Sequence, residues 1–443
     1  MALKVMFISL GCDKNLVDAE KMLGILRKEG YAFTDDETEA EIIIINSCCF
    51  IGDAKEESIN TILEMASLKE NGKCKALIVT GCLTERYQNE FMKELPEVDG
   101  ILGIASWQEI GRVVKDALEK KIPHVFFDKN SLPKTDAERV ITTGGYYAHL
   151  KIAEGCDKCC TYCIIPKVRG RYRSVPMEEL IKEAENLAKQ GVRELILVAQ
   201  ETTLYGVDLY GEKTLPTLIQ RLCEIPGIYW IRLQYCYPEE ITDELIEVIA
   251  SQPKVCHYLD IPIQHGADRI LKRMGRRTNS IQIRQIVEKL RKEIPDIVLR
   301  TTVITGFPGE TEDDFEELME FVDEMEFERL GVFAYSQEED TAAASMEDQI
   351  PEEIKQERRA QVMELQQEIA FEKSESMVGK ILDVMIEGKV ADENAYVGRT
   401  YMDAPGVDGY IFVQTGVELM SGDFVKVKVT GAVEYDLIGE LSE

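Results

Sequence analysis

Short apolar segments alternate with amphipathic helical segments along most of the chain, and this pattern limits the possible folds more than any other feature. In the first 140 residues the apolar runs are "KVMFISLGC", "AEIIIINSCC" and "KALIVTGC", and helical stretches such as "NLVDAEKMLGILRKEG" follow them. Continuous apolar strands between helices are typical of βαβ units, whose parallel strands are covered on both faces. We therefore expect a parallel α/β (Rossmann-like) domain over residues 1–127.

The same alternation resumes after a polar stretch, residues 128–145, which has the composition of a linker. Six further strands are expected, and a long charged helix follows them at residues 351–377. A complete (β/α) barrel has eight such units. The sequence therefore predicts a partial (β/α)6 barrel over residues 146–376, with the strands "YYAHLKIAE", "ELILVAQE", "YWIRLQY", "CHYLDIPIQ", "VLRTTVITGF" and "RLGVFAYSQ".

The last segment, residues 377–443, has a different composition. It is rich in Val and Gly and contains short alternating strands such as "DFVKVKVTGAV", which predict a small antiparallel β-barrel. Residues 378–443 carry 12 acidic and 5 basic side chains, a net charge of −7. Because phosphate contacts dominate nucleic-acid affinity, a tail that binds tRNA should be basic. We therefore expect no direct tRNA binding and a basic protein as the partner.

The cellular setting follows from charge, hydropathy and cysteine content. The chain has 443 residues, a net charge of −30 and 12 cysteines. No apolar run approaches the roughly 20 residues of a membrane span, and the start "MALKVMFISLGC" has the pattern of a strand rather than a signal peptide. We expect a cytoplasmic protein without a membrane segment, in which the cysteines are thiols or metal ligands rather than disulfides.

Three cysteines in the first domain follow strands directly. Cys12, Cys48 and Cys82 each come just after the carboxyl end of an expected strand. In open α/β sheets that edge is where ligands bind. Spacings of this length exclude a local knuckle and favour a site that the fold assembles from three βα loops. Cys49 stands beside Cys48 and is a competing ligand at that position.

Four more cysteines crowd the segment "GCDKCCTYC", after the first expected barrel strand. One interpretation is two C-x2-C pairs around zinc, which needs four ligands in a closed site. The other is C-x3-C-x2-C, formed by Cys156, Cys160 and Cys163, which would hold an iron–sulfur cluster with one open iron. Zinc ribbons separate their two pairs by intervening chain, whereas these pairs abut. The spacing therefore favours the cluster and leaves Cys159 outside it.

This C-x3-C-x-aromatic-C segment, with Tyr162 as its aromatic residue, resembles the signature of the radical S-adenosylmethionine (SAM) enzymes. That family chelates SAM on the open iron and cleaves it to a 5′-deoxyadenosyl radical. Together with the three N-terminal cysteines and a C-terminal barrel of the TRAM type, it resembles the methylthiotransferases over essentially the whole chain. The resemblance implies two 4Fe–4S clusters, an auxiliary one on Cys12, Cys48 and Cys82 and the SAM-binding one on Cys156, Cys160 and Cys163.

The same resemblance implies a reaction and its partners. One SAM would donate a methyl group and another would yield the radical, which can break an unactivated C–H bond where a general base cannot. The stretch "GRTYMDAPGVDGYIFV" resembles the RimO-like branch, which modifies the β-carbon of an aspartate in small-subunit ribosomal protein twelve. Asp403 and Asp408 are then candidate substrate contacts. We also expect a reductant such as flavodoxin or ferredoxin, a sulfur donor and a monomeric enzyme.

Two rival functions stay open. One is the same methylthiolation on a tRNA adenosine, and the other is a non-catalytic protein that binds zinc and RNA.

A further set of residues lies at expected barrel-strand ends or in the cluster loop, where SAM would bind, although each could simply cap a strand. These candidates are Tyr162, Gln200, Glu201, Arg232, Gln264 and Thr302. A basic patch of Arg169, Arg171 and Arg173 either contacts an acidic group or lies in a solvated loop.

Overall fold

The computed structural model describes residues 2–391 and 393–442, which form two compact units. Unit 1 comprises Met1–Thr142, Ala153–Val175 and Ser336–Thr341, and unit 2 comprises Thr143–Ile152, Pro176–Tyr335 and Ala342–Glu443. This division differs from the domain boundaries expected from the sequence. The segment with Cys156, Cys160 and Cys163 belongs to unit 1, together with the other three cysteines, and not to the unit that holds the partial barrel.

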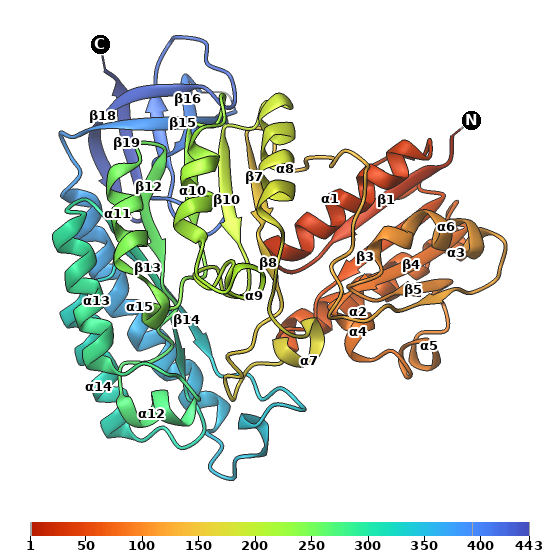
Figure 1. Ribbon diagram of the computed structural model, residues 1–443, viewed down its shortest axis with the longest axis horizontal. Helices are drawn as coiled ribbons and strands as arrows, with labels where there is room; N and C mark the ends of the chain where they lie inside the picture. Colours follow the sequence, from red (N-terminus) through yellow and green to blue (C-terminus); the bar gives the residue numbers. More distant parts are fainter. Residues whose placement is uncertain (1, 392, 443) are drawn as a thin grey trace. The chain divides into compact units, whose positions relative to one another are not determined.

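Unit 1 is built on a six-stranded parallel sheet with the strand order β2-β1-β3-β4-β5-β6 (Figure 1). The strands are β1 (Lys4–Ser9), β2 (Ala32–Phe33), β3 (Ile42–Ser47), β4 (Ala76–Gly81), β5 (Gly100–Leu102) and β6 (His124–Val125). Every residue of β3 and β4 is buried, because helices cover both faces of these central strands. The expected α/β fold of this region is confirmed, including its first three long strands.

Two hydrophobic cores flank this sheet. On one face, α1 (Asp13–Lys28) and α6 (Ile110–Leu118) pack on the strands, with η1 (Trp107–Glu109) before α6. On the other face lie α2 (Gly52–Ala66), α3 (Leu68–Asn71), α4 (Cys82–Arg86) and α5 (Phe91–Glu94). Ile164 and Val168 belong to this second core, so the segment after the second cysteine group packs directly on the N-terminal domain.

The second cysteine group lies in a small addition to unit 1. The segments β8 (Ala153–Glu154) and β9 (Arg173–Ser174) pair antiparallel, and α7 (Ile165–Arg169) lies between them. Gly155 has φ +79°, and a Cβ atom there would lie 2.1 Å from the carbonyl oxygen of Arg171. The two ends of the cysteine loop therefore approach more closely than a side chain at position 155 would permit.

Unit 2 contains a second six-stranded parallel sheet, β14-β13-β12-β11-β10-β7, whose spatial order follows the chain. The strands are β7 (Tyr147–Lys151), β10 (Glu194–Val198), β11 (Trp230–Leu233), β12 (Val255–Asp260), β13 (Val298–Thr305) and β14 (Arg329–Ala334). The edge strands β7 and β14 do not pair with each other. The sheet is therefore an open barrel of six strands, as the sequence predicts.

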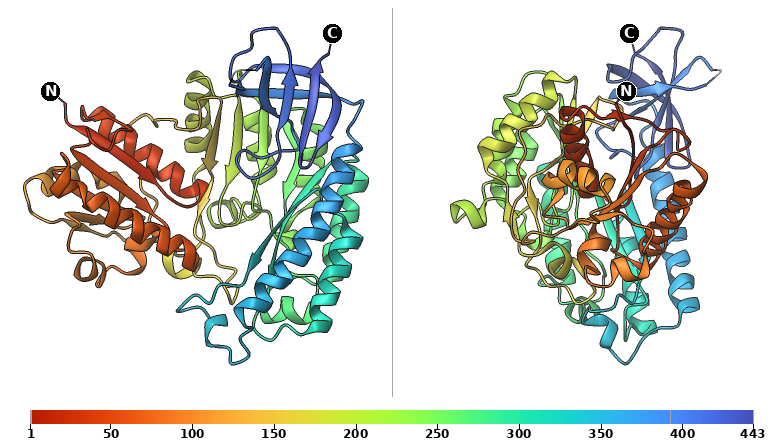
Figure 2. Two further views of the ribbon diagram at one scale, coloured as in Figure 1. Left: turned by 180° about the vertical axis from the view of Figure 1, so that it is seen from behind. Right: turned by 90° about the vertical axis from the view of Figure 1, so that its right-hand side faces the viewer.

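Helices connect these strands and cover the sheet. They are α8 (Met177–Lys189), α9 (Val207–Tyr210), α10 (Leu215–Cys223), η2 (Pro238–Glu240), α11 (Asp243–Ser251), α12 (Asp268–Arg273), α13 (Ser280–Glu293), α14 (Glu312–Met325) and η3 (Ala343–Ser345). The long helix α15 (Glu352–Glu375) packs against β14 and α14 (Figure 2). It matches the charged helix expected at residues 351–377.

The C-terminal segment forms a closed barrel with the order β15-β16-β17-β19-β18 (Figure 2). The strands are β15 (Ile381–Lys389), β16 (Ala395–Arg399), β17 (Ile411–Gln414), β18 (Phe424–Val433) and β19 (Asp436–Leu441). All neighbours pair antiparallel except β17 and β19, which are parallel. The small antiparallel barrel expected from the sequence is confirmed, and it contains one parallel pair because a closed ring with an odd number of strands cannot alternate direction throughout.

A buried ion-pair network joins the C-terminal barrel to the parallel sheet within unit 2. Glu194 of β10 accepts from Nε of Arg232 at 2.7 Å and from Nη2 of Arg399 at 2.7 Å. All three side chains are fully buried. The Arg232 guanidinium lies 4.7 Å from the centroid of the Tyr258 ring, and Arg399 lies 5.4 Å from that of Tyr147. Here the carboxylate compensates two buried cations whose desolvation would otherwise be costly.

The turn after β13 is closed by Glu310. Its carboxylate accepts from the backbone N–H of Gly306 at 3.0 Å and from Arg358 of α15 at 2.7 Å, and His265 lies 3.3 Å away. Burial opposes ionisation, but His265, Gly306 and Arg358 together hold the pKa of Glu310 below its ordinary value. The turn is therefore stabilised by an ionised carboxylate rather than left open for a ligand.

We predict that Glu310→Gln lowers the free energy of unfolding at pH 7 by roughly 1.5–3 kcal/mol, the range for hydrogen bonds to charged groups. A lowered native pKa means that this stabilisation is complete above the ordinary carboxyl pKa and is lost as pH falls through the native value. Denaturant midpoints of both proteins over a descending pH series should therefore converge. A difference that stays constant across the series would contradict this role.

Among the described residues, no helix combines the length and the apolar character that a membrane crossing requires.

Candidate iron–sulfur and SAM site

The three N-terminal cysteines come together at one edge of the unit 1 sheet. Cys12 precedes the first turn of α1, Cys48 follows β3 directly, and Cys82 is the first residue of α4. The strands β1, β3 and β4 are paired in register, with Ser9 opposite Asn46 and Ser47 opposite Gly81. The parallel register thus brings three residues separated by more than 30 positions to the same place, as predicted from the strand pattern.

Burial and charge at this edge suit bound thiolates. Burial raises the pKa of the Cys48 thiol, and the Cys12 charge raises it further. Burial also raises the pKa of Cys82 well above its ordinary value, and Arg169 is the strongest influence in the opposite direction. Cys48 and Cys82 are buried and Cys12 is exposed. Three neighbouring thiols repel one another when ionised, so they gain from a cationic cluster core.

Gly11 leaves the space that Cys48 occupies. Its φ is +86°, and a Cβ atom there would lie 2.7 Å from Cβ and 2.8 Å from Sγ of Cys48. Ser58 of α2 fixes the other side of Cys48 by accepting from its N–H at 3.0 Å and donating to its carbonyl oxygen at 3.0 Å. The cysteine is therefore held in place by its backbone and by a position that tolerates only glycine.

We predict that Gly11→Ala removes the iron bound by Cys12, Cys48 and Cys82, because the new methyl group would displace the Cys48 side chain. Iron per chain after anaerobic reconstitution should fall to roughly half, the loss of one of two four-iron clusters. Gly30→Ala is the matched control, since Gly30 has φ +90° but no atom within 4 Å of its Cβ position. Equal iron loss in both variants would mean that backbone strain, and not the Cys48 contact, is responsible.

Cys49 lies in a different environment from Cys48. It is 1% exposed and belongs to the hydrophobic core behind the sheet, and its carbonyl oxygen accepts from Arg86 at 3.3 Å. Burial raises the pKa of Cys49 to about 12. The assignment of Cys48 as the ligand remains a prediction, because Cys82 belongs to the same hydrophobic core as Cys49.

The second group of cysteines forms a tight loop in unit 1. The N–H of Cys156 donates to Gly170 O at 3.2 Å, and the N–H of Cys163 donates to Cys160 O at 3.0 Å. Burial raises the pKa of Cys163, followed in order by the charges of Cys160, Cys156 and Cys159. Cys159 is exposed and has φ +54°. This conformation is compatible with the three-cysteine interpretation, which leaves Cys159 outside the cluster.

Among the described residues, no three His, Cys, Asp or Glu side chains are arranged to hold a single metal ion. A four-iron cluster makes a different demand, because each thiolate binds its own iron and the sulfurs need not converge on one point. Both groups of three thiols offer soft ligands of the type that iron–sulfur clusters use. They fit a cluster by donor type and by their placement in loops.

The candidate SAM contacts divide between the units. Tyr162 lies in unit 1, and the others lie in unit 2. Gln200 follows β10, and Gln264 lies beside Thr302 of β13, whose carbonyl oxygen accepts from the Gln264 N–H at 2.9 Å. Gln264 has φ +75°, an uncommon conformation that is enriched at functional positions. Gln200 lies just beyond β10, whereas Thr302 is the fifth of the eight residues of β13. Contact of these three residues with SAM stays a prediction.

Other candidates have structural partners instead. Glu201 is fully buried and accepts from the N–H of Thr203 at 2.9 Å, which closes its own loop. Arg232 belongs to the Glu194 network beside the C-terminal barrel, and its predicted contact with SAM stays a prediction. The partners of its guanidinium lie within unit 2, where it pairs with Glu194 of β10 and donates to the carbonyl oxygen of Tyr401 at 2.6 Å.

Asp403 and Asp408 also serve the fold. Asp403 lies 2.7 Å from Nη2 of Arg329, and Asp408 lies 3.4 Å from Nε of Arg300 and accepts from the Tyr258 hydroxyl at 2.8 Å. Both side chains are almost completely buried. These carboxylates hold the C-terminal barrel on the sheet. Their expected role as substrate contacts stays a prediction.

Of the basic residues singled out in the sequence, Arg169 is buried and does not belong to an exposed patch. Arg171 is exposed, whereas Arg169 is 1% exposed and lies among the N-terminal cysteines.

Sequence reasoning also missed Asn15 and Ser58, which support the cysteine loops. Asn15 donates to Leu10 O at 3.1 Å and to Ser47 O at 3.2 Å, joining two of the three loops. The available signal was its position three residues after Cys12, on the first turn of a helix.

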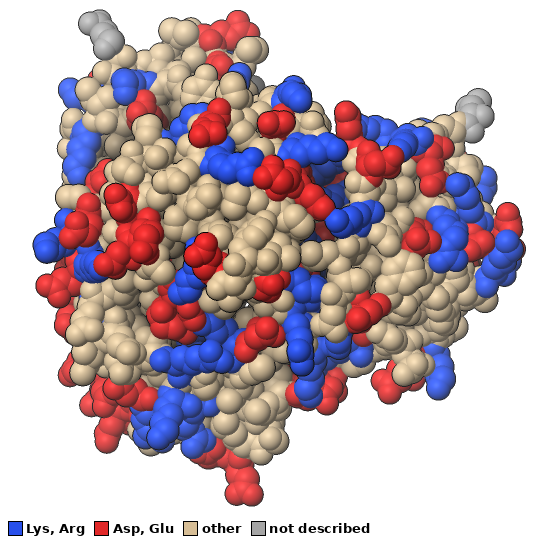
Figure 3. All heavy atoms as spheres, viewed as in Figure 1, with Lys and Arg blue, Asp and Glu red and all other residues tan. Residues whose placement is uncertain are grey.

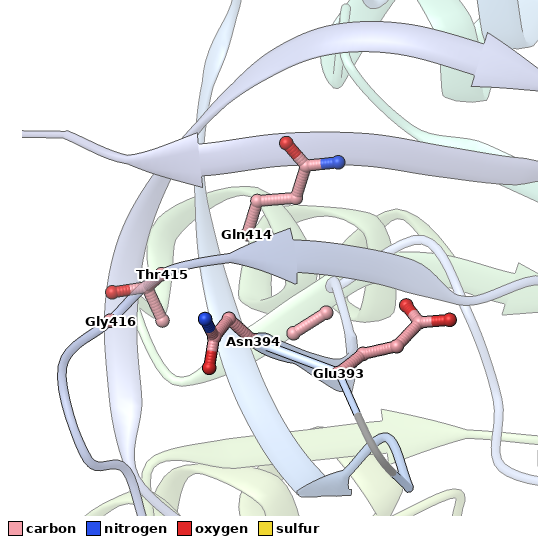
Figure 4. Close-up of a pocket in the computed structure, with 6 residues that line it drawn as sticks. Glu393, Asn394, Gln414, Thr415 and Gly416 are labelled. Carbon is pink, nitrogen blue, oxygen red and sulfur yellow. The ribbon is translucent and has the colours of Figure 1, made fainter.

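The surface indicates the location of a functional site less clearly than the two cysteine loops do. A shallow hollow at one end of the C-terminal barrel is lined by Glu393, Asn394, Ala395, Gln414, Thr415 and Gly416 (Figure 4). It contains no cysteine, and its polar side chains are spread around the rim. Acidic and basic side chains are interspersed over the face shown in Figure 3. On that face the large negative charge therefore does not single out one docking patch.

Comparison with known proteins identifies three family matches in the expected order. The Radical SAM superfamily matches residues 150–322, the uncharacterized protein family UPF0004 matches residues 4–103, and the TRAM domain matches residues 378–441. A protein of Lachnoclostridium phytofermentans named "Ribosomal protein uS12 methylthiotransferase RimO" is 63% identical over 437 residues, with 99% of each chain covered. The chain belongs to the RimO family of radical SAM methylthiotransferases.

Two further RimO relatives match over nearly their full length. The protein of Pelotomaculum thermopropionicum is 51% identical over 99% of each chain, and that of Acetivibrio thermocellus is 52% identical over 100% of this chain and 99% of the relative. Membership of this family makes the chain an enzyme of the sulfur-inserting radical SAM class. It also implies binding of SAM and of a 4Fe–4S cluster.

Solved structures with the same fold share little sequence. The radical SAM methyltransferase TsrM from Kitasatospora setae has a TM-score of 0.53 and 13% identity, covering 75% of this chain and 73% of its own. The cobalamin-dependent radical SAM enzyme OxsB has a TM-score of 0.53 and 15% identity, covering 77% of this chain and 54% of its own. These similarities concern the fold alone.

Proposed function

We propose that this RimO-family enzyme methylthiolates the β-carbon of an aspartate in ribosomal protein uS12, using two 4Fe–4S clusters. The observation that carries the proposal is the 63% identity over 99% of both chains to a relative that is named for this substrate. The two groups of three cysteines within unit 1 support a pair of clusters. The acidic C-terminal segment supports a basic protein substrate rather than tRNA.

The clusters and SAM supply the methyl group, the sulfur and the radical that abstracts hydrogen from an unactivated carbon. The protein provides ligands and positions. Cys156, Cys160 and Cys163 leave one site of their cluster for SAM, and Tyr162 lies in the same loop. Gln200, Gln264 and Thr302 present polar groups at the carboxyl edge of the unit 2 sheet, where a SAM molecule needs partners for its charged and ribose groups.

Several partners follow from this assignment. The reaction requires a one-electron reductant, for which flavodoxin or ferredoxin has suitable chemistry, and a donor of the inserted sulfur. A ribosomal substrate implies that the enzyme works in the cytoplasm. We further propose that the enzyme is a monomer, because both groups of cysteines lie in one chain and one compact unit.

Mass spectrometry of the products tests the substrate. The reconstituted enzyme is incubated anaerobically with SAM, sulfide and dithionite, and with either purified uS12 or total tRNA. We expect uS12 to gain the mass of a methylthio group in place of one hydrogen at a single aspartate, and tRNA to stay unmodified. Modification of tRNA alone would support the adenosine alternative. Zinc without iron in the reconstituted protein would support the non-catalytic alternative.

A further inference from the structure

Arg169 is a buried cation in a place that the reaction described above does not use. It is the last residue of α7, six positions after Cys163, yet its side chain is only 1% exposed. Arginine keeps its charge when it is buried, so a positive charge is fixed inside unit 1. Such a charge is costly to bury and is retained where it has specific partners.

The partners of Arg169 link the two cysteine segments. Nη1 lies 2.8 Å from Oε1 of Glu154, which precedes the second cysteine loop, and 3.6 Å from Oδ2 of Asp18 on α1. Nη2 donates to the side-chain oxygen of Asn15. That same oxygen accepts from the Cys82 thiol at 3.7 Å. One guanidinium thus lies one residue away from an N-terminal cluster ligand.

The charges around Arg169 also link it to the N-terminal cysteines. Burial would lower the pKa of Arg169, but the negative charge of Cys82 raises it most strongly, ahead of Glu154, Asp18 and Cys12. Charge at the N-terminal cysteines and charge on Arg169 therefore stabilise each other across a dry interior.

We propose that Arg169 is a positioning residue that raises the reduction potential of the auxiliary cluster on Cys12, Cys48 and Cys82. The inference rests on the proposed second cluster. Reduction adds one electron to the cluster and neither forms nor breaks a bond. A fixed positive charge beside the thiolates stabilises the form that carries the additional negative charge. The residue belongs to the segment that also carries the SAM-binding cysteines.

The test uses the full-length chain with Cys156, Cys160 and Cys163 replaced by alanine, so that only the auxiliary cluster titrates. Its midpoint potential is measured by anaerobic dithionite titration followed by EPR. Arg169→Gln removes the charge and keeps hydrogen-bonding groups, whereas Arg169→Lys keeps the charge. We expect Arg169→Gln to lower the equilibrium constant for reduction at least tenfold, which is about 59 mV for one electron. Arg169→Lys should remain within about threefold of the parent.

Asp18→Asn provides a test with the opposite sign, which also serves if Arg169→Gln does not fold. Removing this carboxylate leaves Arg169 less compensated, so the equilibrium constant for reduction should rise. Equal potentials in all variants, or shifts of Arg169→Gln and Asp18→Asn in the same direction, would overturn the proposal and leave Arg169 a purely structural role. Absence of iron in the parent variant would instead refute the auxiliary cluster, and this inference with it.

Discussion

Cys48→Ala is expected to abolish methylthiolation of uS12 while SAM cleavage continues. Ser58 holds the backbone of Cys48 and Gly11 leaves room for its side chain at the N-terminal sheet edge, in a different segment from the cysteines of the proposed SAM-binding loop. Loss of a group on which the chemistry depends typically costs on the order of a thousandfold or more in rate. The product is quantified by mass spectrometry of uS12, and 5′-deoxyadenosine release is measured in the same reactions.

Cys49→Ala is the matched control for this prediction. Cys49 is the adjacent thiol, and it belongs to the hydrophobic core that also includes Cys82. Its truncation should leave both reactions and the iron content close to those of the wild type. If Cys49→Ala loses sulfur insertion and Cys48→Ala does not, the ligand assignment is reversed. Loss of both reactions in a folded Cys48→Ala protein would count against separate roles for the two clusters.

Glu194→Gln is expected to have the largest effect on stability. The substitution leaves Arg232 buried without its carboxylate partner and leaves Arg399 with Glu387 alone. Breaking a buried ion pair by neutralising one partner typically costs about 3–5 kcal/mol. The free energy of unfolding of unit 2 can be followed by the fluorescence of Trp230, which lies in the hydrophobic core shared with the C-terminal barrel. Trp107→Phe removes the only other tryptophan signal.

The control for this effect is an exposed pair in the same unit. Glu178 and Arg221 form a 2.6 Å ion pair whose carboxylate is 77% exposed. Water and salt screen such a pair, so Glu178→Gln should leave the unfolding midpoint nearly unchanged. Similar midpoint shifts for Glu194→Gln and Glu178→Gln would show that burial of the Glu194 network contributes little. The C-terminal barrel would then be held mainly by apolar contacts.

The sequence predicted the strands and the cysteines for a clear physical reason. A fully buried parallel strand must be apolar along its whole length, so β3 and β4 are visible as "IIIINS" and "ALIVTG". Ligands at the carboxyl edge must follow such runs directly, as Cys48 and Cys82 do. Both features are local in sequence, and neither requires knowledge of the partners across the fold.

The polar residues were harder to assign because their partners are distant. Arg232, Asp403 and Asp408 were expected near SAM or substrate, yet each has a partner far away in the sequence. Arg232 donates to the carbonyl oxygen of Tyr401, 169 positions away, Asp403 pairs with Arg329, 74 positions away, and Asp408 accepts from Tyr258, 150 positions away. The sequence shows which residues are charged, but it does not show which residues they pair with in the fold. Arg169 shows the same limitation, since nothing local distinguishes it from the exposed Arg171 two residues later.

Iron and sulfide per chain after anaerobic reconstitution test most directly whether each group of three cysteines holds its own cluster. The proteins compared are the wild type, Cys156/Cys160/Cys163→Ala and Cys12/Cys48/Cys82→Ala. We expect roughly eight iron atoms in the wild type and about four in either variant, as two independent four-iron clusters require. About four in the wild type and none in Cys156/Cys160/Cys163→Ala would mean that the N-terminal cysteines bind no cluster, which would contradict the account.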